Sequence, residues 1–462
     1  MLGKIKKVHF VGIGGIGMSG IAEVLINLGF EVSGSDLKVT EITERLRHRG
    51  AVIHEGHKAT NVNDSDVLVY SSAVQLDNPE LKRARKKHIP IIRRAEMLGE
   101  LLKLKQISVA VGGTHGKTTT TSMVGSVLTE ANMDPTLIVG GVVKNLDVNA
   151  LLGQGDVIVA EADEFDKSFL QLTPTYAIIT NIDSDHMDCY DSEEDLLNAF
   201  AQYANATPFY GSVVACGDEP LVKRILPDIS RPVITYGFSG DAEFQADRRQ
   251  YREVRSTFVA KQGKREMGEV ELNVPGAHNV KNALAVIALA TEMEVDFDII
   301  RDGLRRFSGV RRRFEIKGVF DDVIVVDDYA HHPTEVSATL RAIKNGWNRR
   351  LVAVFQPHLY SRTQDFYEDF ARSFLISDIL IVTDVYPARE EPIKGVTGEL
   401  ITNVAKSMGH ENVHWVKDKT RLVSAMKALV EPGDLLITMG AGDIWRICNE
   451  YASILEQEAL EA

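Results

Sequence analysis

A pattern recurs along the chain: a short apolar run, then a turn, then an amphipathic stretch. Short apolar runs bounded by turns are typical of buried strands, and longer amphipathic stretches are typical of helices. Strands that alternate with helices predict parallel sheets and an α/β fold, in which ligands bind beyond the carboxyl ends of strands. The predicted strands are Val8–Ile13, Ile107–Gly112, Val157–Glu161, Ala177–Asn181, Val323–Asp327, Leu351–Phe355, Ile379–Thr383 and Leu435–Met439.

Two short segments predict domain boundaries. Glu100–Lys105 ends a helical stretch before a predicted strand, and the basic segment Phe307–Phe314 precedes another. Inside the middle piece, Tyr251–Pro275 predicts consecutive antiparallel strands that extend the central sheet. Cuts near the two segments give pieces of ordinary domain size, which are residues 1–106, 107–312 and 313–462.

Composition narrows the class of protein. The chain has 462 residues, of which 44% are hydrophobic and 25% charged, and its formal net charge is −13. This excludes wholesale disorder and argues against nucleic acid or a membrane surface as a general partner. Three scattered cysteines without a CxxC spacing predict neither a disulfide framework nor a zinc site, and they fit a cytoplasmic protein. We expect no membrane span and no signal peptide, because the first residues read as a strand and a loop. We expect a monomer or a weak homodimer.

The first glycine motif follows the first predicted strand. Gly12, Gly14 and Gly17 form a G-x-G-x-x-G pattern, a helix follows from about Met18 to Leu28, and Asp36 closes the next strand. Such glycines let the backbone approach a diphosphate, the helix N-terminus binds it, and the acid accepts a ribose hydroxyl. The pattern fits a nicotinamide dinucleotide or a UDP-sugar, and a tight turn without a ligand would show the same glycines.

The second glycine motif, AVGGTHGKTTTTSM, also lies between a predicted strand and a helix. Backbone N–H groups of such a loop cradle phosphates, Lys117 reaches the β and γ oxygens, and the Thr118 hydroxyl can ligate Mg²⁺. The strict pattern has Gly where Val111 stands, and Gly112 and Gly113 supply flexibility one or two residues later. A dehydrogenase has no use for this second loop. The chain is therefore predicted to bind two phosphorylated ligands, one of them ATP.

Acidic and histidine side chains follow two further strands. Glu161 comes first after its apolar run, which favours it as a Mg²⁺ ligand, whereas Glu164 and Asp166 are expected to be solvated. After the next strand, His186 stands among carboxylates. There it could bind a metal, stay protonated against phosphates, or be structural.

Later segments place polar side chains near helix starts. His278, Asn279 and Asn282 begin a helix, and Asn279 is either a nucleotide contact or a helix N-cap. Arg313 is a phosphate clamp or a solvated linker arginine. VVDDYAHHPTEV and FQPHLYSRT end two strands with Asp, His and Arg, which suits recognition of a small zwitterion or a base, although either could be helix capping.

These motifs together resemble those of a known family. GIGGIGMSG, GTHGKTTTTS, EADE, TNIDSDHMD, HNVKNALA, RRF, DDYAHHPTE and FQPHLYSRT stand in the order found in the Mur ligase family, which the chain resembles over nearly its whole length. The resemblance implies a Rossmann-like N-terminal domain for a UDP-sugar, a P-loop-like central ATPase domain and a Rossmann-like C-terminal domain for the amino acid. It implies that ATP, with Mg²⁺, drives the joining of L-alanine to the lactyl carboxylate of UDP-N-acetylmuramate through an acyl phosphate, in peptidoglycan precursor synthesis.

The resemblance also implies roles for individual residues. The implied catalytic residues are Lys117, Glu161, His186, Arg313 and Asp328, with Thr118 and Glu161 on one Mg²⁺ and His186 on a second. The implied ATP contacts are Gly112, Gly113, Thr114, His115, Gly116, Lys117, Thr118, Thr119, His278, Asn279 and Asn282. The implied UDP-sugar contacts are Gly12, Ile13, Gly14, Gly15, Ile16, Gly17, Asp36, Ser71 and Ser72. The implied amino-acid contacts are Tyr329, His331 and Arg362.

Two positions depart from the family's pattern. Leu359 stands where many relatives have Arg, which removes one contact to the alanine carboxylate, and Phe165 follows EADE where Ser is common. A murein-peptide recycling ligase of the same family is the nearest competing hypothesis, and the GIGGIGMSG loop favours the alanine-adding reaction over it. Two hypotheses from different functional classes are a nicotinamide-dependent oxidoreductase, against which the loop at Lys117 speaks, and a nucleotide-regulated binding protein.

Overall fold

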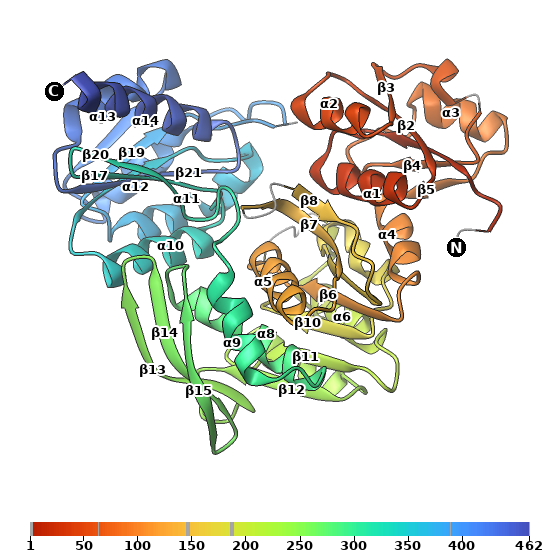
Figure 1. Ribbon diagram of the computed structural model, residues 1–462. Coiled ribbons are helices and arrows are strands. Elements are labelled where there is room, and N and C mark those ends of the chain that lie inside the picture. Colours follow the sequence, from red (N-terminus) through yellow and green to blue (C-terminus); the bar gives the residue numbers. More distant parts are fainter. Residues whose placement is uncertain (1–2, 63, 145–147, 185–188, 389, 462) are drawn as a thin grey trace. The chain divides into compact units, whose positions relative to one another are not determined.

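The structure is a computed structural model that describes residues 3–461 except 63, 145–147, 185–188 and 389 (Figure 1). The described chain forms two compact units, and each is taken by itself. The first unit comprises Met1–Asp247, Val259–Val270 and Lys281–Phe307. The second comprises Arg248–Phe258, Glu271–Val280 and Ser308–Ala462.

The N-terminal sheet is parallel and five-stranded, in the order β3-β2-β1-β4-β5. Helices α1 and α4 contribute to the core on one of its faces and α3 to the smaller core on the other. Because β1 lies between β2 and β4, the strand order reverses beside β1, which is where doubly wound sheets bind ligands. The elements are β1 (Lys7–Val11), α1 (Ile16–Asn27), β2 (Glu31–Asp36), α2 (Glu41–His48), β3 (Val52–Glu55), η1 (Ala59–Val62), β4 (Val67–Tyr70), α3 (Pro79–Lys86), β5 (Ile91–Arg93) and α4 (Arg94–Leu102).

The central sheet has ten strands in the order β15-β14-β13-β12-β11-β10-β6-β9-β7-β8. Strand β6 lies between β10 and β9, and all three are parallel. The strands are β6 (Ile107–Gly112), β7 (Thr136–Val143), β8 (Val148–Leu151), β9 (Val157–Glu161), β10 (Tyr176–Ile179), β11 (Ser212–Cys216), β12 (Val233–Gly237), β13 (Phe244–Arg252), β14 (Arg255–Gln262) and β15 (Arg265–Leu272). The helices are α5 (Lys117–Glu130), η2 (Phe165–Gln171), α6 (Glu193–Asn205), α7 (Pro220–Ile225), η4 (Leu226–Asp228), α8 (Ala277–Glu292) and α9 (Phe297–Arg306).

Strands β13, β14 and β15 are neighbours in the sheet and are joined by very short links. Only antiparallel neighbours can be joined by such tight hairpins. The antiparallel extension predicted over Tyr251–Pro275 is therefore confirmed, with a start at Phe244 instead of Tyr251.

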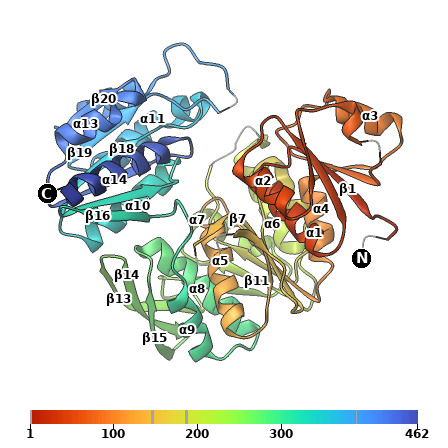
Figure 2. The same ribbon diagram turned by 45° about the horizontal axis from the view of Figure 1, so that its top comes forward.

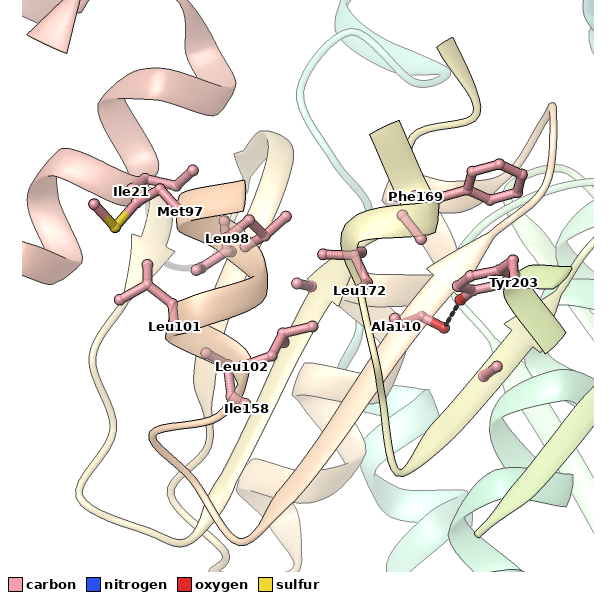
Figure 3. Packing of buried hydrophobic residues seen from close by; sticks show 14 of the residues in the cluster. Ile21, Met97, Leu98, Leu101, Leu102, Ala110, Ile158, Phe169, Leu172 and Tyr203 are labelled. Atoms are coloured by element: carbon pink, nitrogen blue, oxygen red, sulfur yellow. Dashed lines mark hydrogen bonds between the residues drawn. The ribbon is translucent and has the colours of Figure 1, made fainter. Parts of the chain in front are cut away.

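Helix α4 joins the N-terminal and central sheets into one hydrophobic core (Figure 3). Its residues Met97 and Leu101 lie beside Ile21 of α1, and Leu102 lies beside Ile158 of β9. All five side chains are almost fully buried. The elements that carry the two glycine motifs therefore share one continuous hydrophobic core. Burial of such apolar surface is the main stabilising term in folding.

The C-terminal sheet has six strands in the order β16-β17-β21-β18-β19-β20, and β16 pairs antiparallel with β17 while the other pairs are parallel. Side chains alternate between its faces as a strand requires. Ile324 and Val326 pack with α10, α11 and α12, whereas Val323 and Val325 pack with α13 and α14. Figure 2 shows α14 lying across this sheet. The elements are β16 (Glu315–Phe320), β17 (Val323–Asp328), α10 (Pro333–Gly346), β18 (Arg350–Phe355), α11 (Tyr360–Phe374), β19 (Ile379–Thr383), α12 (Gly398–Ser407), β20 (Val413–Val416), η5 (Lys419–Arg421), α13 (Leu422–Leu429), β21 (Asp434–Met439) and α14 (Ile444–Glu461).

The predicted α/β class is confirmed, since three mostly parallel sheets are flanked by helices. Of the helices in the described residues, none has the length and apolar character needed to cross a membrane.

Candidate active site

The first glycine motif turns sharply away from the end of β1. Gly12 has a φ of +82°, which ends the strand at Val11 and not at Ile13 as predicted. The N–H groups of Gly12 and Ile13 donate to the Ser35 carbonyl at 2.8 and 3.1 Å. The Ile13 side chain is buried, so only its backbone faces the loop, while Ile16 is 44% exposed at the start of α1. Hydrogen bonds to the end of β2 therefore fix the start of this loop, which leads into the N-terminus of α1.

Asp36 lies against the same loop. Its Oδ2 accepts the Gly14 N–H at 2.8 Å, and its Oδ1 accepts the Leu37 N–H at 2.8 Å. A Cβ on Gly14 would lie 2.9 Å from Asp36 Oδ2, so a larger residue here would displace the carboxylate. The carboxylate keeps lone pairs for a hydroxyl group of a ligand.

A pocket of about 230 Å³ lies where β4 and β5 end. Ser72 lines it, and Ser71 next to it donates its N–H to the Val11 carbonyl at 3.2 Å. Two arginines, Arg93 and Arg94, also line the pocket and suit an anionic ligand. Sequence reasoning missed both, because nothing around them in the sequence forms a motif.

Arg94 connects the first loop to the acidic segment of the central sheet. Its Nη2 lies 3.2 Å from Asp163 Oδ2, and its Nη1 lies 3.2 Å from where a Cβ on Gly17 would be. Arg93 forms a similar pair with Asp166 at 3.1 Å. Asp166 is 42% exposed and Arg93 is 56% exposed, so this second pair is a surface contact of small energetic value.

The second glycine motif is hydrogen-bonded to the residues that follow β10. The His115 N–H donates to Asn181 Oδ1 at 2.8 Å, and Thr180 Oγ1 donates to the His115 carbonyl at 2.6 Å. Gly113 has a φ of +127°, and a Cβ there would lie 2.0 Å from Thr180 Oγ1. The departure at Val111 also has a structural reason: Val111 is fully buried inside β6, so Gly113 and Gly116 make the turn instead.

Lys117 begins α5, and its ammonium bends back over the loop. Nζ donates to the carbonyls of Gly113 at 2.8 Å and Thr114 at 3.2 Å and lies 2.5 Å from Glu164 Oε2. The Glu164 side chain is 1% exposed, so the expectation that it is solvated is wrong. Burial raises the pKa of Glu164 to about 7, and Lys117 opposes the rise. Burial disfavours the charge of Lys117, but Glu164 and Asp163 outweigh it and raise the Lys117 pKa.

Thr118 and Glu161 come together beside this lysine. Thr118 Oγ1 donates to Glu161 Oε2 at 3.2 Å, and the Gly140 N–H donates to Glu161 Oε1 at 2.6 Å. Burial raises the pKa of Glu161. A hydroxyl and a carboxylate at the mouth of a phosphate loop form a donor set that suits Mg²⁺.

His186 lies outside the described residues, so its predicted role stays a prediction. Two contacts of Asp183, which precedes it, are described: Asp183 Oδ2 lies 3.1 Å from His115 Nε2, and the Asp183 N–H donates to Thr114 Oγ1 at 2.9 Å. The end of β10 thus contacts the phosphate loop through both backbone and side chains.

The three predicted contacts of α8 fall in different units. Asn282 lies in the first unit, and its Oδ1 is 2.8 Å from where a Cβ on Gly116 would be. Asn282 is therefore beside the phosphate loop. His278 and Asn279 lie in the second unit, where Asn279 Nδ2 donates to the Pro275 carbonyl at 2.8 Å. Because α8 begins at Ala277, Asn279 lies within its first turn and is not its N-cap.

In the second unit, Arg313 and Asp328 belong to a charged cluster near the start of α10. Arg313 Nη1 lies 3.3 Å from Glu335 Oε1, and the Arg313 guanidinium carbon is 5.1 Å from the Tyr329 ring centre. Asp328 accepts the N–H groups of Phe314 and Ala330 at 2.8 and 2.7 Å. Burial raises the Asp328 pKa to about 6, while Arg313 opposes the rise. Arg313 is thus held in a charged cluster and is not a solvated linker arginine.

Aromatic side chains continue from this cluster to the end of β18. His331 packs edge-on against Tyr329, with 5.2 Å between ring centres, and against His358 at 5.9 Å. His358 stacks on Tyr386, with 5.8 Å between ring centres. Sequence reasoning missed Tyr386. Arg362 is buried on α11 just after this segment. His332, in contrast, is the N-cap of α10.

The Leu359 backbone is strained. It has a φ of +69°, and its N–H donates to the Tyr386 carbonyl at 3.0 Å. A leucine in this region costs free energy that the surrounding structure must offset, and such strain concentrates at functional sites.

Family models match the chain in three consecutive segments. The model for "Mur ligase family, catalytic domain" matches residues 7–106, that for "Mur ligase middle domain" matches 111–290, and that for "Mur ligase, glutamate ligase domain" matches 312–442.

Curated relatives match over nearly the full length. A UDP-N-acetylmuramate–L-alanine ligase of Salinibacter ruber is 52% identical over 460 residues, which is 99% of this chain and 96% of the relative. A ligase of the same name from Geotalea daltonii is 51% identical over 457 residues, which is 99% of this chain and 100% of the relative.

Solved structures match as well. The UDP-N-acetylmuramate–alanine ligase of Thermotoga maritima has a TM-score of 0.84 and 33% identity, covering 98% of this chain and 99% of that one. A murein peptide ligase of Psychrobacter arcticus has a TM-score of 0.71 and 24% identity, covering 97% and 98%, which supports the fold alone. The two glycine loops, the acidic strand end beside Lys117 and these matches lead to one conclusion: the chain belongs to the Mur ligase family.

Proposed function

We propose that this protein uses ATP to join L-alanine to the lactyl carboxylate of UDP-N-acetylmuramate, as a step of peptidoglycan precursor synthesis. The observation that carries the proposal is the pair of phosphate-type loops in one unit, with Lys117, Thr118 and Glu161 grouped at the second. The relatives at 52% and 51% identity carry the name of this reaction.

The UDP-sugar would bind at the first loop and the adjoining pocket. The backbone of Gly12–Gly17 suits the diphosphate, Asp36 suits a ribose hydroxyl, and Ser71 and Ser72 assist. Arg93 and Arg94 add positive charge beside Ser72. The Asp36 carboxylate would repel a free phosphate, so the ligand must present a hydroxyl there.

ATP would bind at Gly112–Thr119 with Asn282 beside the loop. Thr118 and Glu161 would hold one Mg²⁺, and His186 would hold a second ion. When bound, Mg²⁺ neutralises negative charge on the phosphates. Lys117 would hold the β and γ oxygens, and Arg313 would hold the transferred phosphate. His278, Asn279 and Asp328 would complete the nucleotide site.

The reaction divides into two substitutions. A carboxylate oxygen of the sugar attacks the γ-phosphorus, so that the acyl phosphate forms and ADP leaves. The alanine nitrogen then attacks the acyl carbon, phosphate leaves, and the nitrogen gives up a proton. Tyr329, His331 and Arg362 would position alanine, and Leu359 supplies no guanidinium for its carboxylate.

The remaining assignments follow from the same proposal. The chain would divide functionally at residues 106 and 312, act as a monomer or weak homodimer in the cytoplasm, and need neither nucleic acid nor a membrane. The recycling ligase, the oxidoreductase and the nucleotide-regulated binding protein are not favoured by relatives that match 96% or more of their own length under the alanine-ligase name.

Phosphate release with ATP, Mg²⁺, UDP-N-acetylmuramate and L-alanine, omitting one component at a time, tests the proposal. We expect release to need all four and the product to be heavier by one alanine residue. With ¹⁸O in the sugar carboxylate, label must appear in the released phosphate. Release without alanine, or unlabelled phosphate, would overturn the ligase reaction or its acyl phosphate respectively.

A further inference from the structure

The ammonium of Lys117 has no spare donor in this structure. A lysine ammonium has three N–H groups. The three acceptors around Nζ are the carbonyls of Gly113 and Thr114 and the carboxylate of Glu164. A phosphate oxygen can therefore bond to Lys117 only by replacing one of them.

Glu164 is the partner whose replacement changes the charge balance. Its side chain is 1% exposed, and its Oε1 has no hydrogen-bond partner among the described residues. Its backbone is fixed, because the Tyr190 hydroxyl donates to the Glu164 carbonyl at 2.6 Å. Lys117 is thus the group that compensates a buried carboxylate fixed in place.

We propose that Glu164 is a positioning residue that holds Lys117 against its own loop and competes with the nucleotide phosphates for its ammonium. The proposal rests on the ATP site of the proposed function. It assigns Glu164 an opposite effect from Glu161 on the same segment: Glu161 would help to hold the nucleotide's metal ion, whereas Glu164 weakens nucleotide binding.

The competition has a physical cost that can be measured. When Lys117 turns to a phosphate, Glu164 loses the counter-charge of that ammonium and stays buried beside an incoming anion, and a buried unpaired carboxylate is strongly unfavourable. Burial raises the pKa of Glu164 to about 7 even though Lys117 is present, and this rise agrees with an energetic cost of the buried charge. Glu164→Gln keeps the shape and an acceptor oxygen but removes the charge, so it removes the cost.

A matched control lies at the other end of the same helix. Glu130 is the last residue of α5, about 20 Å from Lys117, and it pairs with Arg306 at 2.6 Å. Glu130→Gln makes the same chemical change, breaks one ion pair and removes one negative charge. It differs from Glu164→Gln chiefly in its distance from the loop.

The experiment measures dissociation constants of the full-length protein for ATP, ADP and AMP with Mg²⁺ by calorimetry, without sugar or alanine. We expect Glu164→Gln to bind ATP and ADP about tenfold more tightly, equivalent to ~1.4 kcal/mol, with AMP unchanged. Glu130→Gln should match the wild type for all three. No tightening, or equal tightening for AMP, would overturn the role of Glu164.

Two outcomes separate failures from one another. If no variant and no wild-type protein binds ATP, the proposed ATP site fails, whereas measurable ATP binding with an unchanged constant in Glu164→Gln contradicts only the competition. If thermal unfolding shows that Glu164→Gln does not fold, Glu164→Asp replaces it. That variant keeps the charge on a shorter arm, so we expect ATP to bind about threefold more tightly. Weaker ATP binding by Glu164→Asp would show that Glu164 assists the nucleotide and would overturn the proposal.

Discussion

The two glycine loops of the first unit use opposite chemistry on the same backbone plan. Each follows a parallel strand and opens a helix. In the first loop, backbone N–H groups donate to Ser35 and Asp36 of the neighbouring strand, and the loop itself carries no cation. In the second, the loop supplies its own cation, and Lys117 donates to loop carbonyls and to Glu164.

This difference indicates how each loop selects a ligand. The first loop offers neutral amides and one acid, so it suits a diphosphate joined to a sugar whose hydroxyl meets Asp36. The second offers an ammonium beside a metal-type donor set, so it suits phosphates whose charge changes during a reaction. A glycine pattern alone therefore indicates a loop whose backbone can bind a phosphate. The charged side chains next to the loop decide which class of phosphorylated ligand it binds.

Removing the cation should abolish the function of the second loop and spare the first. We expect Lys117→Met to lower kcat by about 10²–10³-fold, measured by phosphate release, with UDP-sugar binding unchanged. It should also destabilise the fold, because Glu164 loses its partner. The double variant with Glu164→Gln should regain the melting temperature but not the activity. Recovery of activity in the double variant would contradict the role of Lys117.

The two loops should also differ in their tolerance of a methyl group. At Gly113 the φ of +127° and the 2.0 Å approach to Thr180 both oppose alanine, so Gly113→Ala should cost about 1–3 kcal/mol of unfolding free energy. At Gly15 the φ is −64° and the nearest atom lies 3.6 Å away, so Gly15→Ala should change stability by less than about 0.5 kcal/mol. Urea unfolding of both variants makes the comparison, and equal costs would refute it.

The acid of the first loop should affect only the sugar nucleotide. Asp36→Asn keeps an oxygen for the Gly14 N–H but loses the charge that strengthens a bond to a ligand hydroxyl. We expect the KM for UDP-N-acetylmuramate to rise about tenfold while the KM for ATP is unchanged. A rise in both constants would mean that the change spreads through the shared core instead of acting at one loop.

The acid of the second loop should leave a pH signature in stability. Burial raises the pKa of Glu164 from 4.5 to about 7, against the effect of Lys117. The folded protein then holds this proton more tightly than the unfolded chain, so the contribution of Glu164 to stability is full below pH ~4.5 and is lost as the pH rises through ~7. The unfolding free energy of the wild type minus that of Glu164→Gln should therefore fall by about 3 kcal/mol over this range. Urea titrations at several pH values measure it, and a level or rising difference would count against the assignment.

Much of the fold could be predicted because its strands are simple buried runs. The bounds predicted for β6, β9 and β19 agree with the structure, since each is a continuous apolar run inside a parallel sheet. The first strand was predicted to end two residues too late, because apolar Ile13 continues the pattern after Gly12 has already turned the backbone. Hydrophobicity does not show where φ becomes positive.

The proximity of Thr118 to Glu161 could be predicted because a phosphate-loop motif at a helix start and an acid at the end of a neighbouring strand both point to it. The burial of Glu164 could not be predicted, because it depends on the following turn. Asp166 and Lys167 have φ values of +54° and +53°, and the Lys167 N–H donates to the Glu164 carbonyl at 3.1 Å. Arg94 was missed for a related reason: its partner Asp163 is distant in the sequence, and only the shared core brings the two together.

The three bonds of Lys117 also bear on the search for inhibitors of this loop. An empty phosphate loop is commonly pictured as an open cradle that welcomes any anion. Here the cradle already contains its own counter-ion, so a fragment that merely carries negative charge must evict Glu164 and gains little. A compound that instead leaves the Lys117–Glu164 pair intact would not have to displace the carboxylate, and ATP, whose phosphates compete for Lys117, could not imitate it.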